Sequence, residues 1–209
     1  MPPFEVQNTA ELADAAKQEL RKRLRSLRQA HPAETLAARS RAIVGRVASL
    51  PAFVAAGSVA LFFPMLERKE VDLRELDAEA RRQGKRVYYP FLEPRGEALV
   101  SGLRLTASLD ELAERGQRFF EPPPDAPVAG RGDVDLVLVP ALAAAPSGHR
   151  LGYGAGFYDS LLPDVCPPAR ALVVVYDFQL LVELPTLPHD FACDVIVTDA
   201  RVLPVPPAT

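Results

Sequence analysis

Hydrophobic residues near the start of the chain recur at the spacing of one helical face. Between residues 11 and 28 they follow one another at steps of three and four, which predicts an amphipathic helix with Thr9 as its N-cap. A similar pattern predicts a second helix over residues 33–49, which Pro51 stops. The apolar positions of the first helix are Leu12, Ala16, Leu20, Leu24 and Leu27.

Short and nearly unbroken apolar runs follow, and they are typical of strands that are buried on both faces. Helical patterns at residues 71–83, closed by Gly84, and at residues 157–162 separate some of these runs. Residues 98–105 alternate weakly, which indicates an edge strand. The predicted buried strands are 57–63, 86–91, 135–139 and 171–176, with short final strands at 195–198 and 202–203, a helical turn at 109–114 and a surface connection at 121–132.

Alternating buried strands and amphipathic helices predict an α/β fold, with a three-layer, open, mostly parallel sheet and helices on both faces. We expect one domain over residues 1–209, with the helical segment 10–50 packing on it. Ligands of such sheets bind beyond the carboxyl ends of the strands. This rule brings Glu70, Pro90 and the stretch 150–159 to a single cleft.

The stretch 150–159 reads R-L-G-Y-G-A-G-F-Y-D and carries the clearest chemistry of the chain. Glycine at every second position lets the backbone bring its N–H groups close to a ligand. Consecutive N–H groups that point into such a turn form a concavity that suits phosphate. Arg150 adds a permanent cation at its start, and Asp159 adds a hard oxygen ligand for Mg²⁺. The spacing matches neither the P-loop nor the dinucleotide-binding pattern. A helix that begins at Phe157 would also point its N-terminus at the bound phosphate.

Bulk composition is that of an ordinary globular protein, with 48% hydrophobic and 24% charged residues. No apolar run is long enough to cross a membrane, and no secretory signal is apparent, so we expect a cytoplasmic protein with no membrane partner. Cys166 and Cys193 lack the spacing of a metal or redox motif, and we interpret them as buried reduced thiols.

The net charge of −3 is unevenly distributed, because residues 17–46 carry nine basic and two acidic side chains. Such a segment can bind a polyanion such as nucleic acid, or a single nucleotide. Lys17 and Arg21 are four residues apart and therefore lie on one helical face. On their own they would be interpreted as solvated surface charges.

Several short motifs occur in one particular order along the chain. They are K-Q-E-L-R at 17–21, E-V-D at 70–72, G-K-R-V-Y-Y-P at 84–90, E-P at 121–122, D-L-V-L-V-P-A-L at 135–142, the glycine stretch at 150–159 and D-V-I-V-T-D at 194–199. With these motifs in this order, the chain resembles the 5-formyltetrahydrofolate cyclo-ligase family, also called methenyltetrahydrofolate synthetases. The resemblance extends from Lys17 to Val202.

The resemblance implies a role for each matching residue. Arg150 and Tyr158 would act in catalysis, Asp159 and Asp194 would hold Mg²⁺, and taken alone Asp194 would suit a strand start or a turn. The implied ATP-binding residues are Lys17, Arg21, Arg150, Leu151, Gly152, Tyr153, Gly154, Ala155, Gly156, Phe157 and Tyr158. The implied folate-binding residues are Glu70, Tyr153, Gly154, Ala155, Gly156 and Phe157.

The reaction that the resemblance implies is the ATP- and Mg²⁺-dependent closure of 5-formyltetrahydrofolate, with or without a polyglutamate tail, to 5,10-methenyltetrahydrofolate. Phosphorylation of the formyl oxygen would let N10 close the ring, with release of ADP and phosphate. We expect a monomer with no nucleic-acid partner. The alternatives are a non-catalytic folate- or nucleotide-binding protein on the same scaffold, a nucleic-acid binder, and an ATP-independent isomerase or transferase on a related sheet.

The chain departs from the family pattern at a few positions. The segment between Pro64 and Glu70 is about two residues longer than usual, so Glu67 competes with Glu70 for the folate-binding role. Leu73 replaces a common threonine, and Ala155 and Phe157 replace the commoner glycine and tyrosine of the loop. Neither loop change removes a charge, so we expect activity to survive.

Overall fold

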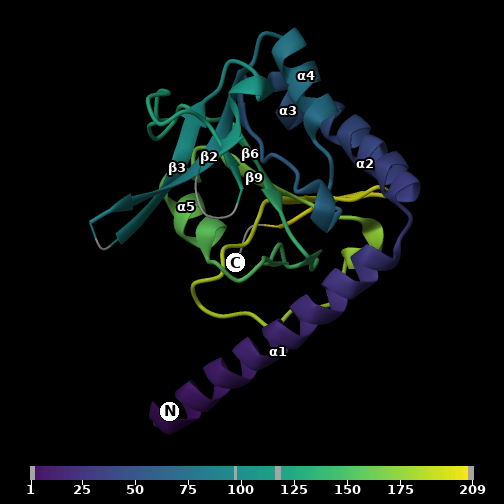
Figure 1. The fold of residues 1–209 in the computed structure, drawn as a ribbon. Helices are drawn as coiled ribbons and strands as arrows, with labels where there is room; N and C mark the ends of the chain where they lie inside the picture. The colour runs from purple at the N-terminus through teal and green to yellow at the C-terminus, as the bar shows by residue number, and fades with distance from the viewer. Residues whose placement is uncertain (1–2, 97, 116–118, 207–209) are drawn as a thin grey trace.

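A computed structural model describes residues 3–96, 98–115 and 119–206 of the chain. It contains a seven-stranded sheet in the order β11-β10-β9-β6-β1-β2-β3, with helices packed around it (Figure 1). The α-helices are α1 (Pro3–Ala30), α2 (Ala33–Ala48), α3 (Pro51–Ala55), α4 (Arg74–Arg82) and α5 (Phe157–Val165). The strands of this sheet are β1 (Ser58–Ala60), β2 (Arg86–Arg95), β3 (Ala98–Leu105), β6 (Leu136–Pro140), β9 (Arg170–Val174), β10 (Val195–Val197) and β11 (Val202–Pro204).

The five central strands of the sheet run parallel, and both edge strands are antiparallel to their neighbours. In the middle of the sheet, β6 pairs with β9 so that Leu138 lies opposite Leu172. β3 forms one edge by pairing with β2, which confirms the prediction of an edge strand over residues 98–105. The mostly parallel α/β architecture predicted from the sequence is therefore confirmed.

Alternate residues of the central strands pack against helices on opposite faces of the sheet, which makes the three layers. Leu136 and Leu138 of β6 belong to a core cluster with residues of α2, α3 and α4. Val137 and Val139, one position along, belong to a second cluster with residues of α5. Because successive side chains of a strand point to opposite faces, a strand buried on both must be apolar at every position. The unbroken apolar runs of the sequence have this cause.

Several helix boundaries differ from those predicted. α1 begins at Pro3, so Thr9 lies inside the helix, and the prediction that it is the N-cap is wrong. Pro51 does end the second helical segment, but it also starts α3, because proline is well suited to the first turn of a helix. Gly84 follows α4 with a φ of +74°, as the predicted glycine stop requires.

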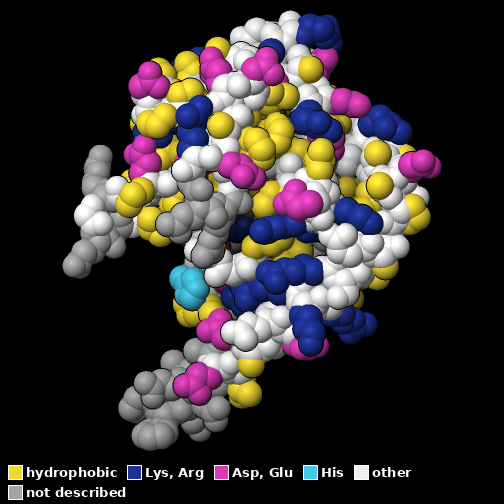
Figure 2. All heavy atoms as spheres, in the orientation of Figure 1, with side chains coloured by type: hydrophobic (Ala, Val, Ile, Leu, Met, Phe, Trp, Pro, Cys, Tyr) yellow, Lys and Arg dark blue, Asp and Glu magenta, His cyan; other side chains and the backbone are white. Residues whose placement is uncertain are grey.

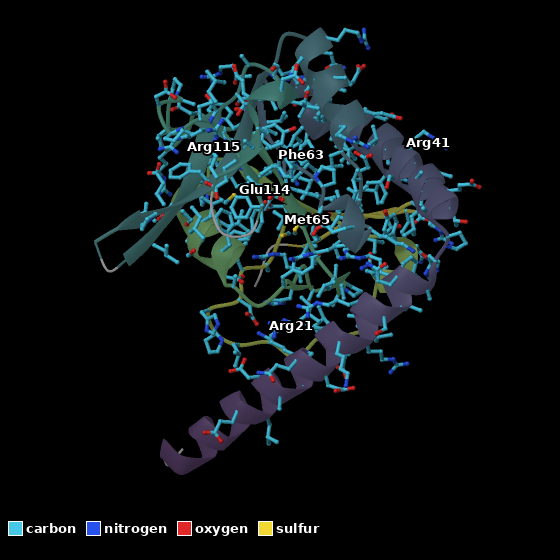
Figure 3. All side chains as sticks on the ribbon, viewed as in Figure 1. Arg21, Arg41, Phe63, Met65, Glu114 and Arg115 are labelled. Carbon is cyan, nitrogen blue, oxygen red and sulfur yellow. The ribbon has the colours of Figure 1, made fainter. Side chains whose placement is uncertain are left out.

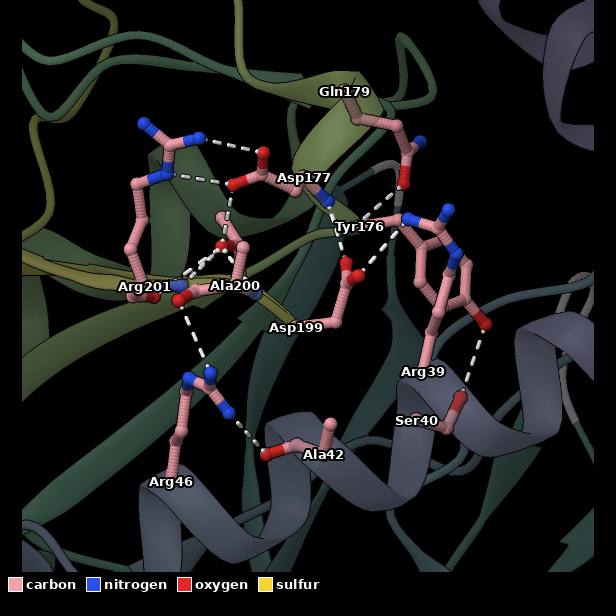
Figure 4. A network of polar contacts seen from close by, with 11 residues as sticks. Arg39, Ser40, Ala42, Arg46, Tyr176, Asp177, Gln179, Asp199, Ala200 and Arg201 are labelled. Carbon is pink, nitrogen blue, oxygen red and sulfur yellow. Dashed lines mark hydrogen bonds and ion pairs between the residues drawn. The ribbon is translucent and has the colours of Figure 1, made fainter.

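A polar network fixes α2 to the turn between β10 and β11 (Figure 4). Asp199 accepts hydrogen bonds from Arg39 Nη1 at 2.9 Å and from the backbone N–H of Asp177 at 2.7 Å. Asp177 in turn pairs with Arg201 at 2.8 Å. We call this set the α2 network; its charged groups are matched by partners of opposite sign or by backbone groups.

Helix α1 packs away from the two main core clusters, against a small hairpin formed by β7 (Ala143–Ala144) and β8 (Arg150–Leu151). Its Leu24 is buried with Leu142 and Leu151 in a third, smaller apolar cluster. Figure 1 shows α1 as a long helix along one side of the body, separate from α2, α3 and α4. No helix within the described ranges is long and apolar enough to cross a membrane.

Candidate active site

The glycine loop lies between β8 and α5, where the turn needs backbone conformations that favour glycine. Gly154 has a φ of +102°, and Gly156, the N-cap of α5, has a φ of +66°. Ala155 is not among the described non-glycine residues with positive φ, so it occupies its position without that strain. The loop thus keeps glycine at two positions that need it, and the replacement of glycine by Ala155 is structurally inexpensive.

The basic face of α1 lies directly against this loop. Arg21 donates from Nε to the carbonyl oxygen of Gly152 at 3.0 Å, and Arg25 donates from Nη2 to the carbonyl oxygen of Tyr153 at 3.3 Å. In Figure 3, Arg21 lies on the side of α1 that faces Met65. Two segments about 130 residues apart in sequence are therefore joined, as the shared nucleotide site predicted from the sequence requires.

Lys17 lies one turn before Arg21 on α1, and its side chain forms an ion pair with Asp190 instead of contacting the loop. Its Nζ lies 2.5 Å from Asp190 Oδ2, and the Lys17 residue is 5% exposed. Burial alone raises the pKa of Asp190, but hydrogen bonds from Lys17 and from the Leu187 N–H outweigh it and leave the pKa below its usual value. The Lys17 charge is therefore already balanced, and the sequence carried no signal for Asp190 as its partner.

Arg150 and Asp159 form an ion pair at the two ends of the glycine stretch. Arg150 donates from Nη2 to Asp159 Oδ1 at 2.9 Å and from Nη1 to the carbonyl oxygen of Phe191 at 2.8 Å. The Phe191 N–H donates to the same Asp159 oxygen at 3.1 Å. Asp159 stands in the first turn of α5, where the helix dipole favours a negative charge.

Glu70 is buried at 5% exposure and lies near Tyr153 of the loop. Its Oε2 accepts a hydrogen bond from the Met65 N–H at 2.9 Å, whereas Oε1 has no partner among the described residues. Burial raises the pKa of the Glu70 carboxyl, although the nearby Tyr153 hydroxyl, the hydrogen bond from the Met65 N–H and the charges of Arg28 and Arg68 oppose the shift. Oε1 is an acceptor that a ligand donor would satisfy.

Glu67, the competing carboxylate, lies in the short helix η1 (Leu66–Arg68) and points to solvent, with its side chain 72% exposed. Its nearest cation is Arg68, at 3.8 Å. The geometry favours Glu70 over Glu67 for binding inside the cleft, because only Glu70 presents a buried and incompletely paired oxygen.

Two tyrosines of the loop lie near Glu70. Burial raises the pKa of Tyr153 above its ordinary value, and the negative charge of Glu70 adds to the effect. Burial and the Glu70 charge raise the pKa of Tyr158 in the same way, while the charge of Arg150 opposes them. Both phenols therefore stay protonated at neutral pH and can donate hydrogen bonds.

Asp194 occupies a structural position at the amino ends of β9 and β10. Its Oδ2 accepts a hydrogen bond from the Ala171 N–H at 2.7 Å. Burial raises the pKa of the neighbouring Cys193 thiol to about 11, with the charges of Asp194 and Asp159 contributing to the rise and that of Arg150 opposing it. Both carboxylates predicted as metal ligands therefore influence the pKa of the same buried thiol.

The carboxylates near the glycine loop suit Mg²⁺ only in a site where phosphate oxygens and water complete the coordination. The described residues contain no group of three or more His, Cys, Asp or Glu side chains placed to hold a metal ion. Mg²⁺ is commonly bound by one or two carboxylates, with phosphate oxygens and water completing the coordination. Asp159 fits that description, because its ion pair leaves Oδ2 over, whereas Asp194 already accepts a hydrogen bond from a strand N–H.

A second buried acid, Glu121, lies on a short strand outside the glycine loop. Glu121 ends β5 (Phe120–Glu121), and its Oε1 has no partner among the described residues. Phe120 of the same strand packs on Phe63, with ring centroids 4.8 Å apart. The rings of Phe119 and Phe157 pack edge to face, with their centroids 5.5 Å apart. Aromatic rings therefore extend from the glycine loop toward the sheet beside Glu121.

Sequence reasoning did not identify three arginines that surround Tyr153. Arg28 donates from Nη2 to the Tyr153 hydroxyl at 2.6 Å, and Arg68 and Arg25 lie 5.5 and 5.9 Å from the centroid of its ring. Figure 2 shows Lys and Arg side chains gathered between α1 and the rest of the molecule. Arg25 and Arg28 follow Arg21 at steps of four and three, so helical spacing could have pointed to them.

Comparisons with known proteins bear on the family of the chain and on its fold. Residues 13–199 match the model of the 5-formyltetrahydrofolate cyclo-ligase family. A 5-formyltetrahydrofolate cyclo-ligase of Escherichia coli K12 is 30% identical over 159 residues, which cover 75% of this chain and 86% of that protein. One of Mycolicibacterium smegmatis is 48% identical over 80 residues, but that match covers only 38% of this chain and 41% of the relative.

Solved structures show the same likeness. The 5,10-methenyltetrahydrofolate synthetase of Aquifex aeolicus superposes with a TM-score of 0.78 at 30% identity, covering 92% of this chain and 94% of that one. The synthetase of Mycoplasma pneumoniae shares the fold, with a TM-score of 0.67 at 20% identity over 88% of this chain and 98% of the other. The family match, the extended relatives and the loop geometry agree, and the chain belongs to the 5-formyltetrahydrofolate cyclo-ligase family of enzymes.

Proposed function

We propose that this enzyme closes 5-formyltetrahydrofolate to 5,10-methenyltetrahydrofolate in a reaction that consumes ATP, requires Mg²⁺ and releases ADP and phosphate. The observation that carries the proposal is the contact of the basic face of α1 with the glycine loop, through the hydrogen bond of Arg21 to Gly152. Backbone N–H groups, a helix N-terminus and arginine side chains together form the environment that a triphosphate needs.

The chemistry of the reaction suits these groups. The formyl oxygen attacks the γ-phosphorus, the bond to ADP breaks, and the oxygen becomes part of a phosphate leaving group. N10 then attacks the formyl carbon and loses its proton, and the carbon–oxygen bond breaks as phosphate departs. Phosphoryl transfer asks the protein chiefly for positioning and charge neutralisation, so no nucleophilic side chain is required.

Each residue of the site has a distinct part in the proposal. Arg21 and the loop N–H groups would orient the phosphates, and Arg150 would neutralise charge as the γ-phosphoryl group moves. Glu70 would accept a hydrogen bond from the folate, and the protonated Tyr158 would donate one nearby. When bound, Mg²⁺ supplies further positive charge to the phosphate oxygens.

The metal role is tested through Asp159. In Asp159→Asn, the Mg²⁺ concentration that gives half-maximal activity is expected to rise about tenfold, because one anionic ligand is lost. The measurement is a titration of activity with Mg²⁺ at saturating ATP. An unchanged requirement would remove Asp159 from the metal site.

The compartment and assembly of the enzyme are part of the same proposal. Both cysteines are free and buried, which accords with a reducing cytoplasm. We take the chain as a single domain that acts as a monomer, which size-exclusion chromatography with light scattering tests.

The deciding experiment is incubation of the purified chain with 5-formyltetrahydrofolate, ATP and Mg²⁺. Absorbance of the methenyl product and the appearance of ADP should rise together in equal amounts. Binding of both substrates without product would favour a non-catalytic binding protein. Product formation that does not depend on ATP would contradict the proposed chemistry.

A further inference from the structure

A basic hollow opens between the end of α1, η1 and the glycine loop. It has a volume of about 420 Å³ and is lined by Arg25, Arg28, Gln29, Arg68 and Tyr153. Three of these five side chains are guanidinium groups, which stay charged at every physiological pH. None of the residues that the resemblance named for phosphate binding lines the hollow, except Tyr153. We call it the arginine hollow.

The walls of the arginine hollow are fixed by a clasp between α1 and η1. Gln29 donates from Nε2 to the carbonyl oxygen of Glu67 at 2.9 Å. Lys69, in the left-handed conformation with a φ of +54°, donates from Nζ to the carbonyl oxygens of Gln29 at 2.6 Å and His31 at 2.7 Å. The clasp holds Arg68 of η1 opposite the arginines of α1, so the site is preformed.

Arg28 is the buried member of this set, and its hydrogen bonding is incomplete. It is 3% exposed, and while one terminal nitrogen donates to the Tyr153 hydroxyl, its Nε has no partner among the described residues. A buried charged group that lacks a partner is costly, which makes each such atom a pointer to something that completes it. An acceptor oxygen placed in the hollow would do so.

Nearby acids compensate the positive charge only in part. Glu67 lies 3.8 Å from Arg68, but both side chains are substantially exposed, so their attraction is weakened by solvent. Glu70 lies near both Arg28 and Arg68, but its Oε2 accepts from the Met65 N–H, and one carboxylate does not neutralise three guanidinium groups. Two other cations of the region, Lys17 and Arg150, differ because each has a carboxylate within 3 Å.

We infer that the arginine hollow binds an anionic oxygen-bearing group of a substrate, either a carboxylate of the folate glutamyl tail or a phosphate of the nucleotide. Planar guanidinium groups recognise both groups through paired hydrogen bonds, so the two sources share one chemistry. The inference rests on the proposed function for the identity of the substrates, but the preference of the hollow for anions can be tested without catalysis.

The test uses the full chain and substitutions of the two more exposed arginines. Arg25→Gln, Arg68→Gln and the double variant remove charge while leaving the buried Arg28 in place, and Arg41→Gln on the exposed face of α2 is the matched control. Calorimetry measures the binding of inorganic tripolyphosphate and of γ-linked triglutamate. Steady-state kinetics measures KM for ATP, for 5-formyltetrahydrofolate and for 5-formyltetrahydropteroate, which lacks the glutamate.

If the hollow takes the tail, the double variant raises KM for 5-formyltetrahydrofolate about tenfold, leaves KM for the pteroate unchanged and weakens triglutamate binding. If the hollow takes a phosphate, KM for ATP and the dissociation constant of tripolyphosphate rise about tenfold instead. Equal behaviour of the double variant and Arg41→Gln in every assay would overturn the inference. Anion binding that depends on Arg25 and Arg68 in a chain without cyclisation activity would refute the proposed function and leave the hollow standing.

Discussion

Two polar networks join segments that are far apart in the sequence, and they are completed to different degrees. In the α2 network, Asp199 and Asp177 are each matched by an arginine and by neighbouring polar groups. In the network between α1 and the glycine loop, Arg28 Nε and Glu70 Oε1 are buried without partners among the described residues. In the first network the described polar groups have partners within the protein. In the second network one donor and one acceptor, on side chains of opposite charge, are left for a ligand to pair with.

The difference separates a structural role from a functional one. A satisfied network contributes to the stability of the fold and gains nothing from a ligand. An unsatisfied one lowers stability until something binds, which is the cost that active sites commonly carry. Substitutions in the α2 network should therefore change stability alone, whereas substitutions around the loop should change activity as well.

The largest effect is expected for Arg150→Ala, which removes the cation that contacts Asp159 and Phe191. We expect kcat/KM for ATP to fall about 100-fold, because a preorganised positive charge is lost where negative charge develops. Steady-state kinetics at saturating folate measures this change. Activity within a factor of two of the Arg41→Ala control would show that Arg150 holds only the loop.

Glu70→Gln is expected to raise KM for the folate about tenfold and to leave KM for ATP nearly unchanged, since it removes a charged acceptor. Glu67→Gln is the matched control and should change neither constant. If Glu67→Gln raises the folate KM and Glu70→Gln does not, the assignment of the two carboxylates is reversed.

The pH dependence of the same pair gives a further check. The folded protein raises the pKa of Glu70, so it binds the Glu70 proton more tightly than the unfolded chain does. The Glu70 contribution to stability should therefore fall as the pH rises from the unfolded to the folded pKa, and Glu70→Gln should gain stability relative to wild type over that range. Chemical unfolding at acidic and neutral pH measures this. A stability difference between Glu70→Gln and wild type that is the same at both pH values would contradict it.

Gly154→Ala and Ala155→Gly make a matched pair within the loop. Gly154 has a positive φ, and a Cβ there would lie 3.4 Å from Arg21 Cζ, so we expect a loss of stability of about 1–3 kcal/mol and a several-fold loss of activity. Ala155→Gly relieves no strain and should change activity less than about twofold. Thermal unfolding and kinetics of both variants test the contrast, which equal losses would refute.

The smallest effect on activity is expected from the α2 network. Asp199→Ala removes the acceptor for Arg39 and for the Asp177 N–H, and it should cost about 1–3 kcal/mol of unfolding free energy. Both KM values should stay within about twofold of wild type under conditions where the variant is folded. A large change in KM would mean that the two networks are coupled.

Much of the fold was predictable because the sequence shows short, nearly unbroken apolar runs for the strands and helical periodicity for the helices. β6 and β9 lie within one or two residues of their predicted ranges. The hairpin of β7 and β8 was not predicted, because two-residue strands carry no periodicity. β1 is shorter than its apolar run, since only Ser58–Ala60 form the strand before the chain turns toward the cleft.

The candidate site was predictable only where residues form a local pattern. The glycine stretch is recognisable from its alternating glycines. Lys17 and Arg21 were identified from helical spacing combined with the family resemblance. Asp190 and Arg68 could not be identified, because each meets its partner across a long sequence separation and neither belongs to a motif. Contacts of this kind are decided by tertiary packing, which a single sequence does not display.

The attachment of α1 has a practical consequence. This helix carries Lys17 and Arg21 of the proposed nucleotide site, yet its buried apolar contacts belong to a small cluster around Leu24 rather than to the two large clusters that join the sheet to its other helices. Elements with few buried apolar contacts open at lower free energy than the rest of a protein. The enzyme should therefore lose activity at urea concentrations that leave the sheet folded. Limited proteolysis should cut first near the amino terminus.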